Sequence, residues 1–324
     1  MTGLSIRQWL YTSTKVNRGA KEILRRFDLS RPDDHFLIFG NYRGGTTWLA
    51  ETLSNKTQYP LLWEPDNPEQ LNVLAELNFC WEQIIPHDAS WFDAGNAFEK
   101  ILSKKVLNNW LCRNNKPVDF LGKNEMIVKF VRGNGFAVWL VNNVRPKNYP
   151  VVILRHPIAV AASALSHGAW DHLTPKIGIP NGRYQEFYEK HKDLFSSIDT
   201  IAERHVAMWC LQNVNLLNYE RLHDDFVVVF YESLLQNPVE NINKILASWG
   251  LEKRDLDVAR LTQPSSTTLG KNTALHADEQ ITKWESIFSK REISKMLYIM
   301  EYFGIEVYDR DPTPKKCALV LGAK

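Results

Sequence analysis

Residues Gly40–Trp48 form a glycine-rich segment between a short apolar stretch, His35–Phe39, and a helical pattern that runs through Leu53. The first backbone N–H groups of a helix have no intrahelical partner, and the helix dipole favours negative charge at the same end. A strand that leads through glycines into a helix is therefore the setting of a phosphate-binding loop. We predict that the rest of the chain is arranged around such a loop.

The spacing of this loop is close to that of the nucleotide-triphosphatase motif G-x-x-x-x-G-K-[ST]. It runs from Gly40 through Gly45 to Thr47, but Thr46 occupies the lysine position, and a cation, Arg43, lies two residues before Gly45. Without the lysine, the loop lacks the charge that holds the β- and γ-phosphates of a nucleoside triphosphate. The loop is thus predicted to bind a phosphate that is not part of a magnesium–triphosphate complex. A turn without a ligand needs fewer of these residues.

Strand-length apolar segments alternate with helical patterns along the chain. Val151–Leu154 precedes a helix from Pro157 to about Leu165, and the strand Phe226–Tyr231 precedes a helix over Pro238–Trp249. Continuous apolar strands that alternate with helices indicate a parallel sheet covered on both faces. We therefore predict an α/β fold, a three-layer αβα sandwich with a central, mostly parallel sheet.

Three helix starts carry capping signals. Thr200 with Glu203 and Ser289 with Glu292 have the spacing of a capping box, and Asn237 precedes a proline at the first helical position.

The chain of 324 residues shows no repeat and no linker, which predicts a single domain over 1–324. Residues 4–27, within an N-terminal basic helix over 1–30, place six cations beside apolar positions. We expect this helix to pack on the domain, although a basic amphipathic helix can also lie on a membrane surface. The stretch of about 65–125 is less regular and is predicted to be an insertion or lid between sheet strands.

Composition excludes several classes of protein. The net charge of +2 is too small to predict nucleic-acid binding. No apolar run approaches the roughly 20 residues of a membrane span, and no signal peptide is evident. The four cysteines form no C-x-x-C pair or zinc-ligand spacing, so we expect reduced thiols and a cytoplasmic protein without a metal. The oligomeric state has no signal in the sequence.

A second anion site is predicted at the end of the strand Val151–Leu154. Arg155 follows this strand, Pro157 begins the next helix, and Ser163 comes eight residues after the arginine. Eight residues are slightly more than two helical turns, so Ser163 returns towards the strand end. A guanidinium fork and a hydroxyl at one place suit phosphate oxygens.

The two motifs together resemble those of the PAPS-dependent sulfotransferases (PAPS is 3′-phosphoadenosine 5′-phosphosulfate). Arg43-Gly44-Gly45-Thr46-Thr47-Trp48 is similar to their 5′-phosphosulfate loop, which reads R-S-G-T-T or K-S-G-T-T before an apolar residue, and Arg155…Ser163 is similar to their 3′-phosphate motif. The resemblance implies a P-loop-like sulfotransferase fold with PAPS as donor and PAP as product. The departure is Gly44, where the family has a serine that restrains the neighbouring cation.

The resemblance also assigns roles within this site. It implies that Arg43 stabilises charge on the transferring group, that Thr46 and Thr47 hold the 5′-phosphate, and that Tyr231, in Phe230–Leu234, lies near the adenine. The R-K-G triplet of the cytosolic branch is absent before Trp284. The full predicted donor-binding set is Arg43, Gly44, Gly45, Thr46, Thr47, Trp48, Arg155, Ser163, Tyr231, Ser265, Thr268 and Lys271.

Glu64 is the predicted catalytic base. It lies 21 residues after Arg43, in the region of the next strand end, and the strand ends of such sheets line the ligand crevice. The carbohydrate and tyrosyl-protein branches of the family have a glutamate at this offset, whereas the phenol and steroid branch uses a histidine further on, which makes His87 the rival. Lys129 resembles a lysine near the reacting centre of some glycan sulfotransferases. A solvated lysine on an edge strand is the alternative.

The acceptor is predicted from a mixture of aromatic and carboxylate side chains. The mixture suits a small polar acceptor, either a sugar or a cationic natural product bound by cation–π contacts and ion pairs, sulfated on a hydroxyl or an amine. Three alternatives remain: a kinase with a degenerate loop, a PAP-binding module without catalysis, and a membrane-associated enzyme that acts on a glycolipid. The mixture consists of Trp63, Glu64, Asp66, Trp81, Glu82, Trp91 and Asp93.

Overall fold

A central sheet of five parallel strands organises the computed structural model, which describes residues 31–120, 123–251, 266 and 276–315. The strand order is β2-β3-β1-β4-β5, and every neighbouring pair is parallel. The prediction of a mostly parallel α/β sheet is confirmed. The strands are β1 (Phe36–Gly40), β2 (Leu61–Trp63), β3 (Ile127–Phe130), β4 (Val151–Leu154) and β5 (Val227–Phe230).

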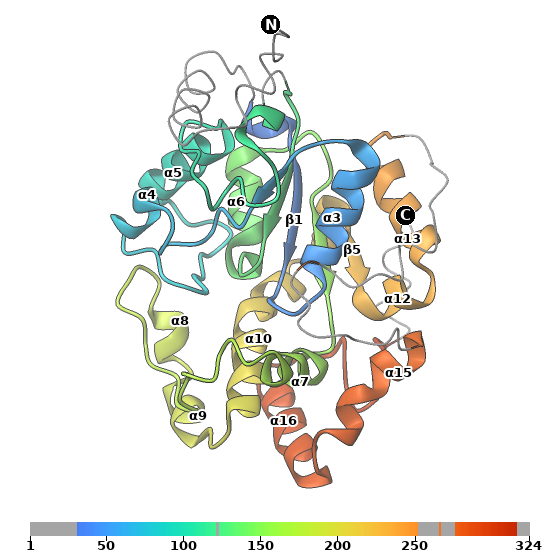
Figure 1. The fold of residues 1–324 in the computed structure, drawn as a ribbon. Coiled ribbons are helices and arrows are strands. Elements are labelled where there is room, and N and C mark those ends of the chain that lie inside the picture. The colour runs from blue at the N-terminus through green and yellow to red at the C-terminus, as the bar shows by residue number, and fades with distance from the viewer. Residues whose placement is uncertain (1–30, 121–122, 252–265, 267–275, 316–324) are drawn as a thin grey trace, which may run out of the picture.

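Helices cover both faces of the sheet (Figure 1). Successive side chains of a strand point to opposite faces, so Leu37 and Phe39 of β1 join one hydrophobic cluster, whereas Phe36 and Ile38 join the other. The first cluster includes residues of α6 (Ala137–Val144), α7 (Pro157–His167), α10 (Ile201–Leu217) and α16 (Lys290–Tyr302), and the second includes residues of α3 (Thr46–Thr57), α12 (Tyr231–Gln236) and α13 (Pro238–Ser248). The three-layer prediction is therefore confirmed.

The interval 65–125 is less irregular than the sequence suggests. It contains α5 (Phe92–Leu102), an eleven-residue helix whose Ala94, Phe98 and Ile101 are fully buried in the first cluster. The apolar spacing of these positions is helical, but the tryptophans and polar residues around them obscure it. The remaining short elements are η1 (Pro32–Asp34), α4 (Asn72–Ala75), η2 (Pro117–Phe120), η3 (Asn134–Phe136), α8 (Glu186–Glu189), α9 (Lys192–Ser197), α11 (Leu222–Asp225), α15 (Ala277–Thr282) and η4 (Lys283–Ser286).

Several predicted boundaries move by a residue or more. Tyr231 begins α12 and does not end β5, and α7 runs two residues past Leu165. Asn237 makes no side-chain capping bond at α13. In the parts of the chain that the structure describes, no helix has the length and apolarity that a bilayer span needs. The basic N-terminal helix predicted over 1–30 lies outside the described residues.

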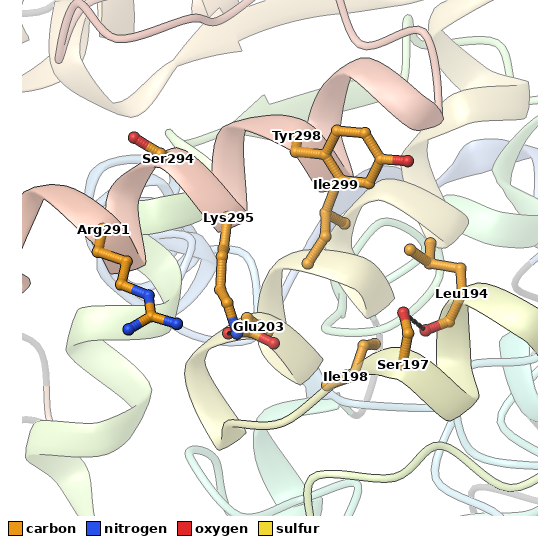
Figure 2. A pocket seen from close by; sticks show the side chains of 9 residues that line it. All are labelled: Leu194, Ser197, Ile198, Glu203, Arg291, Ser294, Lys295, Tyr298 and Ile299. Carbon is orange, nitrogen blue, oxygen red and sulfur yellow. Dashed lines mark hydrogen bonds and ion pairs between the residues drawn. The ribbon is translucent and has the colours of Figure 1, made fainter.

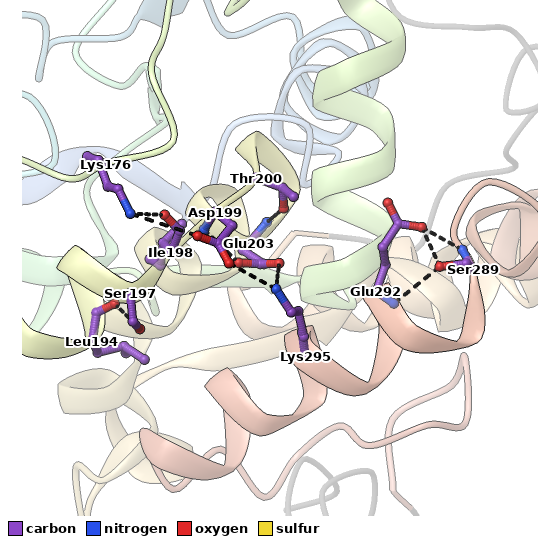
Figure 3. Close-up of polar contacts among 10 residues, drawn as sticks. All are labelled: Lys176, Leu194, Ser197, Ile198, Asp199, Thr200, Glu203, Ser289, Glu292 and Lys295. Carbon is purple, nitrogen blue, oxygen red and sulfur yellow. Dashed lines mark hydrogen bonds and ion pairs between the residues drawn. The ribbon is translucent and has the colours of Figure 1, made fainter.

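Helix α16 docks on the start of α10 through polar contacts at the edge of a hollow (Figure 2). The hollow has a volume of about 370 Å³ and is lined by residues of α9, α10 and α16. Lys295 of α16 pairs with Asp199 (3.1 Å) and Glu203 (3.5 Å) ahead of and within α10 (Figure 3). None of the residues predicted to bind the donor or the acceptor lines this hollow.

Two of the predicted capping signals are found. Thr200 accepts a hydrogen bond from the backbone N–H of Glu203, although the Glu203 carboxylate bonds to Asp199 and not to the cap residue. The capping box at α16 is complete, because Ser289 accepts from the Glu292 N–H and the Glu292 carboxylate accepts from the Ser289 N–H (Figure 3).

We expect Ser289→Ala to lower the free energy of unfolding by roughly 1 kcal/mol, because the substitution removes one half of this box. Ser294→Ala on the same helix is the matched control, since its exposed hydroxyl bonds only to the Lys290 carbonyl. Urea denaturation of both variants beside the wild type measures the effect. Equal losses in the two variants would show that the box does not stabilise α16.

Candidate functional site

The glycine-rich loop folds as a tight turn that opens α3. Gly45 is the N-cap residue with φ +93°, and a Cβ built there would lie 2.5 Å from Cδ2 of Tyr231. The N–H of Gly44 donates to the carbonyl of Asn41 at 3.0 Å, and Arg43 within this turn has φ +57°. The first turn of α3 contains no acidic residue. No side chain of the described residues caps this helix start, so the backbone N–H groups of Thr46 and Thr47 are available to an anion, as the sequence predicts.

The second predicted motif lies against this loop. Arg43 Nε donates to Ser163 Oγ at 3.1 Å, and an Arg155 guanidinium N–H donates to the carbonyl of Arg43 at 2.8 Å. The Arg155 guanidinium also lies 4.3 Å from the ring centre of Tyr231. The structure thus brings together predicted donor-binding residues that follow three different strands, β1, β4 and β5.

The charge at this place is positive. Burial, and then the neighbouring charge of Arg155, lowers the pKa of Arg43. In the described ranges, neither arginine forms an ion pair with a carboxylate. Two guanidinium groups held side by side in this way repel each other, and an anion between them removes the repulsion. The arrangement suits a ligand with several negative charges.

Four buried amide side chains form a hydrogen-bonded cluster that includes Asn41 of the glycine-rich loop. Asn41 donates to Gln212 at 2.6 Å and accepts from Asn213 at 2.8 Å, and Asn213 in turn accepts from Asn134 at 2.7 Å. All four are nearly or fully buried. Sequence reasoning missed this cluster because Gln212 and Asn213 lie about 170 positions from Asn41. The local signal was two adjacent amides in an otherwise apolar stretch of α10.

A second buried group holds the strand end that carries Arg155. Glu232 accepts from the His156 N–H (2.9 Å) and from the Tyr308 hydroxyl (2.9 Å), and the His156 ring stacks on Trp284. Burial raises the pKa of Glu232, and the hydrogen bond from the His156 backbone opposes that rise. The adjacent residues Tyr231 and Glu232 thus have different contacts, since Tyr231 lies against the Arg155 guanidinium and Glu232 binds the backbone of His156. The late tryptophan, Trp284, supports the same turn.

Glu64 and Lys129 meet at the ends of β2 and β3. Lys129 Nζ donates to Glu64 Oε1 at 2.8 Å and to Thr47 Oγ1 of the loop at 3.1 Å, and it lies 3.3 Å from the Trp63 ring centre. Burial lowers the pKa of Lys129, while the charge of Glu64 opposes that change. The predicted base is therefore joined to the phosphate loop through one lysine.

The alternative of a solvated edge-strand lysine is wrong. Strand β3 pairs with β2 on one side and with β1 on the other, and the Lys129 side chain is fully buried. The strand alternation directs Ile127 and Lys129 to the face that α3 covers, where Thr47 is.

Asp66, which follows β2, lies at the same strand ends. Its Oδ2 accepts from the backbone N–H groups of Val131 (3.2 Å) and Arg132 (2.9 Å), which follow β3. Its Oδ1 is buried and has no hydrogen-bond partner among the described residues. Burial raises the pKa of Asp66 to about 6, although the bond from the Arg132 backbone opposes the rise.

Other predicted residues are placed elsewhere or not described. His87 is exposed in its loop, and its ring lies 6.0 Å from that of Tyr219. Trp48 is half-buried against the second hydrophobic cluster. Ser265, Thr268 and Lys271 lie outside the described residues. Within the described ranges, no three His, Cys, Asp or Glu side chains form a group that could hold a metal ion.

Ser266, the one described residue of its segment, contacts α3. Its N–H and hydroxyl both donate to the carboxylate of Glu51, the first at 3.2 Å. Ser266, which lies in the chain between the predicted donor-binding residues Ser265 and Thr268, therefore contacts the helix that the glycine-rich loop opens.

Comparisons with known proteins identify a family. A family model for the sulfotransferase domain matches residues 33–297. No curated protein sequence matches the chain significantly.

Three solved structures are weakly similar to the chain. The first is the sulfotransferase domain of the Synechococcus PCC 7002 olefin synthase, with 18% identity, TM-score 0.43, and coverage of 88% of this chain and 98% of that chain. The second is mouse sulfotransferase SULT7A1 complexed with PAP, with 17% identity, TM-score 0.42, and coverage of 93% and 92%. The third is a sulfotransferase from Alicyclobacillus acidocaldarius, with 12% identity, TM-score 0.39, and coverage of 84% and 97%.

We expect Asp66→Asn to raise the free energy of unfolding at pH 8 by roughly 1–3 kcal/mol. A carboxyl whose pKa rises on folding binds its proton more tightly in the folded state, so its ionisation destabilises the protein as the pH rises from about 4 through 6. The neutral amide removes that cost.

Urea denaturation at pH 5 and pH 8 measures this effect, and the gain should be smaller at pH 5. Asp88→Asn, which changes an exposed loop carboxylate, is the control and should show no such difference. The same gain at both pH values would contradict burial as its cause.

Proposed function

Because the chain belongs to the sulfotransferase domain family, we propose that it transfers the sulfuryl group of PAPS to a hydroxyl or amine of a small polar acceptor. The observation that carries this proposal is the contact of Arg43 with Ser163 and Arg155 beside Tyr231. These four residues were assigned to one nucleotide by resemblance, and they converge although they follow three different strands.

The donor site is proposed to use the loop and the two arginines. Free N–H groups at the start of α3, with Thr46 and Thr47, would hold the 5′-phosphate. Arg155 and Ser163 would hold the 3′-phosphate, and Tyr231 would contact the base. The unpaired arginines and the absence of acidic residues in the first turn of α3 fit a ligand with this much negative charge.

The transfer itself needs positioning, charge stabilisation and a base. PAPS supplies the sulfuryl group and leaves as PAP. Arg43 would stabilise the negative charge that develops on the departing phosphate. Glu64 would accept the proton of the acceptor hydroxyl or amine, and Lys129 would orient that carboxylate relative to Thr47.

We expect the protein to bind PAP in EDTA, and Arg155→Ala to weaken that binding roughly tenfold or more, because a charge-assisted fork to phosphate is lost. Isothermal titration with PAP, beside ATP with Mg²⁺, makes the measurement. Arg221→Ala, which removes an exposed arginine paired with Asp225, is the control and should bind PAP as the wild type does. Binding of ATP–Mg²⁺ in place of PAP would favour the kinase alternative.

Glu64→Gln is expected to lower kcat by roughly 100- to 10,000-fold, the usual contribution of a general base, with little change in PAP affinity. Glu76→Gln, which changes the exposed carboxylate directly after α4, is the matched control and should keep full activity. Initial rates of sulfation with saturating PAPS test this. Unchanged kcat in Glu64→Gln would remove Glu64 from the role of base, and tight PAP binding without turnover in the wild type would favour the non-catalytic alternative.

A further inference from the structure

Arg132 lies at the end of β3 among side chains from three other parts of the chain. We call this group the Arg132 cluster; it consists of Arg132, Tyr42, Trp81, Glu82 and His205. The Arg132 guanidinium is 4.2 Å from the ring centre of Trp81 and 5.3 Å from that of Tyr42. Trp81 and Glu82 belong to the mixture of aromatic and carboxylate side chains predicted to bind the acceptor, and the proposed transfer step does not use the cluster.

The guanidinium of Arg132 has few partners. Its side chain is only 15% exposed, and its sole ion pair among the described residues is Nε to Glu82 Oε1 at 3.8 Å, which is too long for a hydrogen bond. The hydrogen bond that Arg132 does make is through its backbone N–H, to Asp66. A charge this far removed from water is costly unless it is well hydrogen-bonded. The N–H groups of this arginine are therefore ready for an acceptor that the described part of the chain does not supply.

The surrounding residues hold the guanidinium in place. The Tyr42 hydroxyl and His205 Nδ1 are hydrogen-bonded at 2.7 Å, and Trp81 Nε1 donates to Glu69 at 2.7 Å. Asp66 fixes the backbone of Arg132 at 2.9 Å. An arginine fork that lies against aromatic rings suits planar, bidentate recognition of an anionic group.

Charged groups of both signs surround the cluster. Asp66 accepts from the Arg132 backbone and Glu69 accepts from Trp81, so Glu82 is the carboxylate that pairs with the guanidinium. Burial raises the pKa of Glu82, while Arg132 and Arg204 oppose the rise. The same two arginines lower the pKa of His205 together with burial, which is the largest cause. Glu64 is already paired with Lys129. Because the contact with Glu82 is too long for a hydrogen bond, the guanidinium N–H groups are the donors that an anion would meet here.

The tryptophan faces that suggested a cationic acceptor are already in contact with cations of the chain. Lys129 lies over Trp63, Arg132 over Trp81 and Arg183 over Trp91. The cation–π argument for a cationic acceptor therefore finds no support at these faces.

The cluster adjoins the proposed reacting groups in the chain. Tyr42 directly precedes Arg43, and Arg132 follows Lys129 by three residues on the same strand end. Since β1 and β3 are neighbours, Arg132 lies beside Tyr42 of the loop that also carries Arg43.

We propose that Arg132 is an acceptor-binding residue, and that the acceptor carries a carboxylate or an ester sulfate which the Arg132 guanidinium binds. This inference rests on the proposed sulfotransferase function and specifies its substrate class. An acidic sugar or an acidic phenol has the chemistry that this site recognises.

Matched acceptors that differ at one substituent, anionic in one member and neutral in the other, test the proposal. One set is p-nitrophenyl glucuronide and the 6-sulfated p-nitrophenyl glucoside against the neutral glucoside, and the other is p-hydroxyphenylacetate against its amide. Binding to the PAP-saturated protein is measured by titration calorimetry, and sulfation is measured with PAPS. We expect the charged members of at least one set to bind roughly tenfold or more tightly, as one charge-assisted hydrogen-bond pair provides. The glucuronide and the sulfated glucoside separate the two anionic groups.

Variants of Arg132 complete the experiment. Arg132→Gln should abolish the difference between charged and neutral members, and Arg132→Lys should restore only part of it, because a lysine keeps the charge but not the fork. Arg183→Gln removes an exposed arginine that lies over a different tryptophan, so it controls for the loss of one charge. We expect Arg132→Gln to keep the melting temperature and the PAP affinity of the wild type, which would show that the variant is folded.

The outcomes separate this inference from the proposed function. Failure of the wild type to bind PAP would contradict the proposed function, and this inference with it. If PAP binds, equal affinity within both sets, no binding of any member, or a preference that survives in Arg132→Gln would overturn the role of Arg132 alone.

Discussion

The hydrogen bond from the Arg155 guanidinium to the carbonyl of Arg43 determines how the site is built. It joins the loop after β1 to the end of β4, and it holds two cations close together at neighbouring strand ends. Like charges in a partly buried place repel strongly, so the surrounding structure must keep both arginines where they are. Buried hydrogen bonds around Asn41 and Glu232 hold the backbone on which the two arginines lie.

Two buried groups of hydrogen-bonded side chains hold the two arginines in position. Beneath the loop, the amide cluster around Asn41 satisfies the donors and acceptors of its members through α10 and η3. On the other side, Glu232 binds the backbone of His156, next to Arg155, and is itself bonded to Tyr308 near the end of the described chain. Buried hydrogen-bonded networks of this kind are costly to break. A site with fixed donors aimed at an anion does not have to reorganise when the ligand arrives.

Local patterns in the sequence were sufficient for the parts of the site that lie within one strand–loop–helix unit. The loop from Gly40 to Thr47 and the pair Arg155–Ser163 are each contained in about ten residues, and their spacing reports helix geometry directly. The parallel direction of the strands also followed from the alternation of strands and helices. Strand β2 has only three residues, which is too short for a periodic signal, and its end was located through Glu64 by resemblance.

Contacts between distant segments were beyond the reach of such patterns. Glu64 and Lys129 are 65 positions apart, and nothing in either segment shows that β2 and β3 are neighbours. The buried state of Lys129 follows from its place in an inner strand, and its alternation alone also fits an edge strand. The amide cluster and the contact of Arg132 with Tyr42 depend in the same way on strand order, which fixes the neighbours of each strand end.

The glycine at position 44 shows how one local departure is accommodated by a distant residue. A Cβ at Gly44 would lie 2.8 Å from the carbonyl of Asn41, the same carbonyl that accepts the Gly44 N–H. The tight turn therefore leaves no room for the serine that the resemblance leads one to expect there. The hydroxyl that bonds to Arg43 comes instead from Ser163 of α7, on the far side of the β4 strand end. Restraint of the arginine is thus preserved, but it depends on the packing of α7 against the sheet and not on the residue next in the chain.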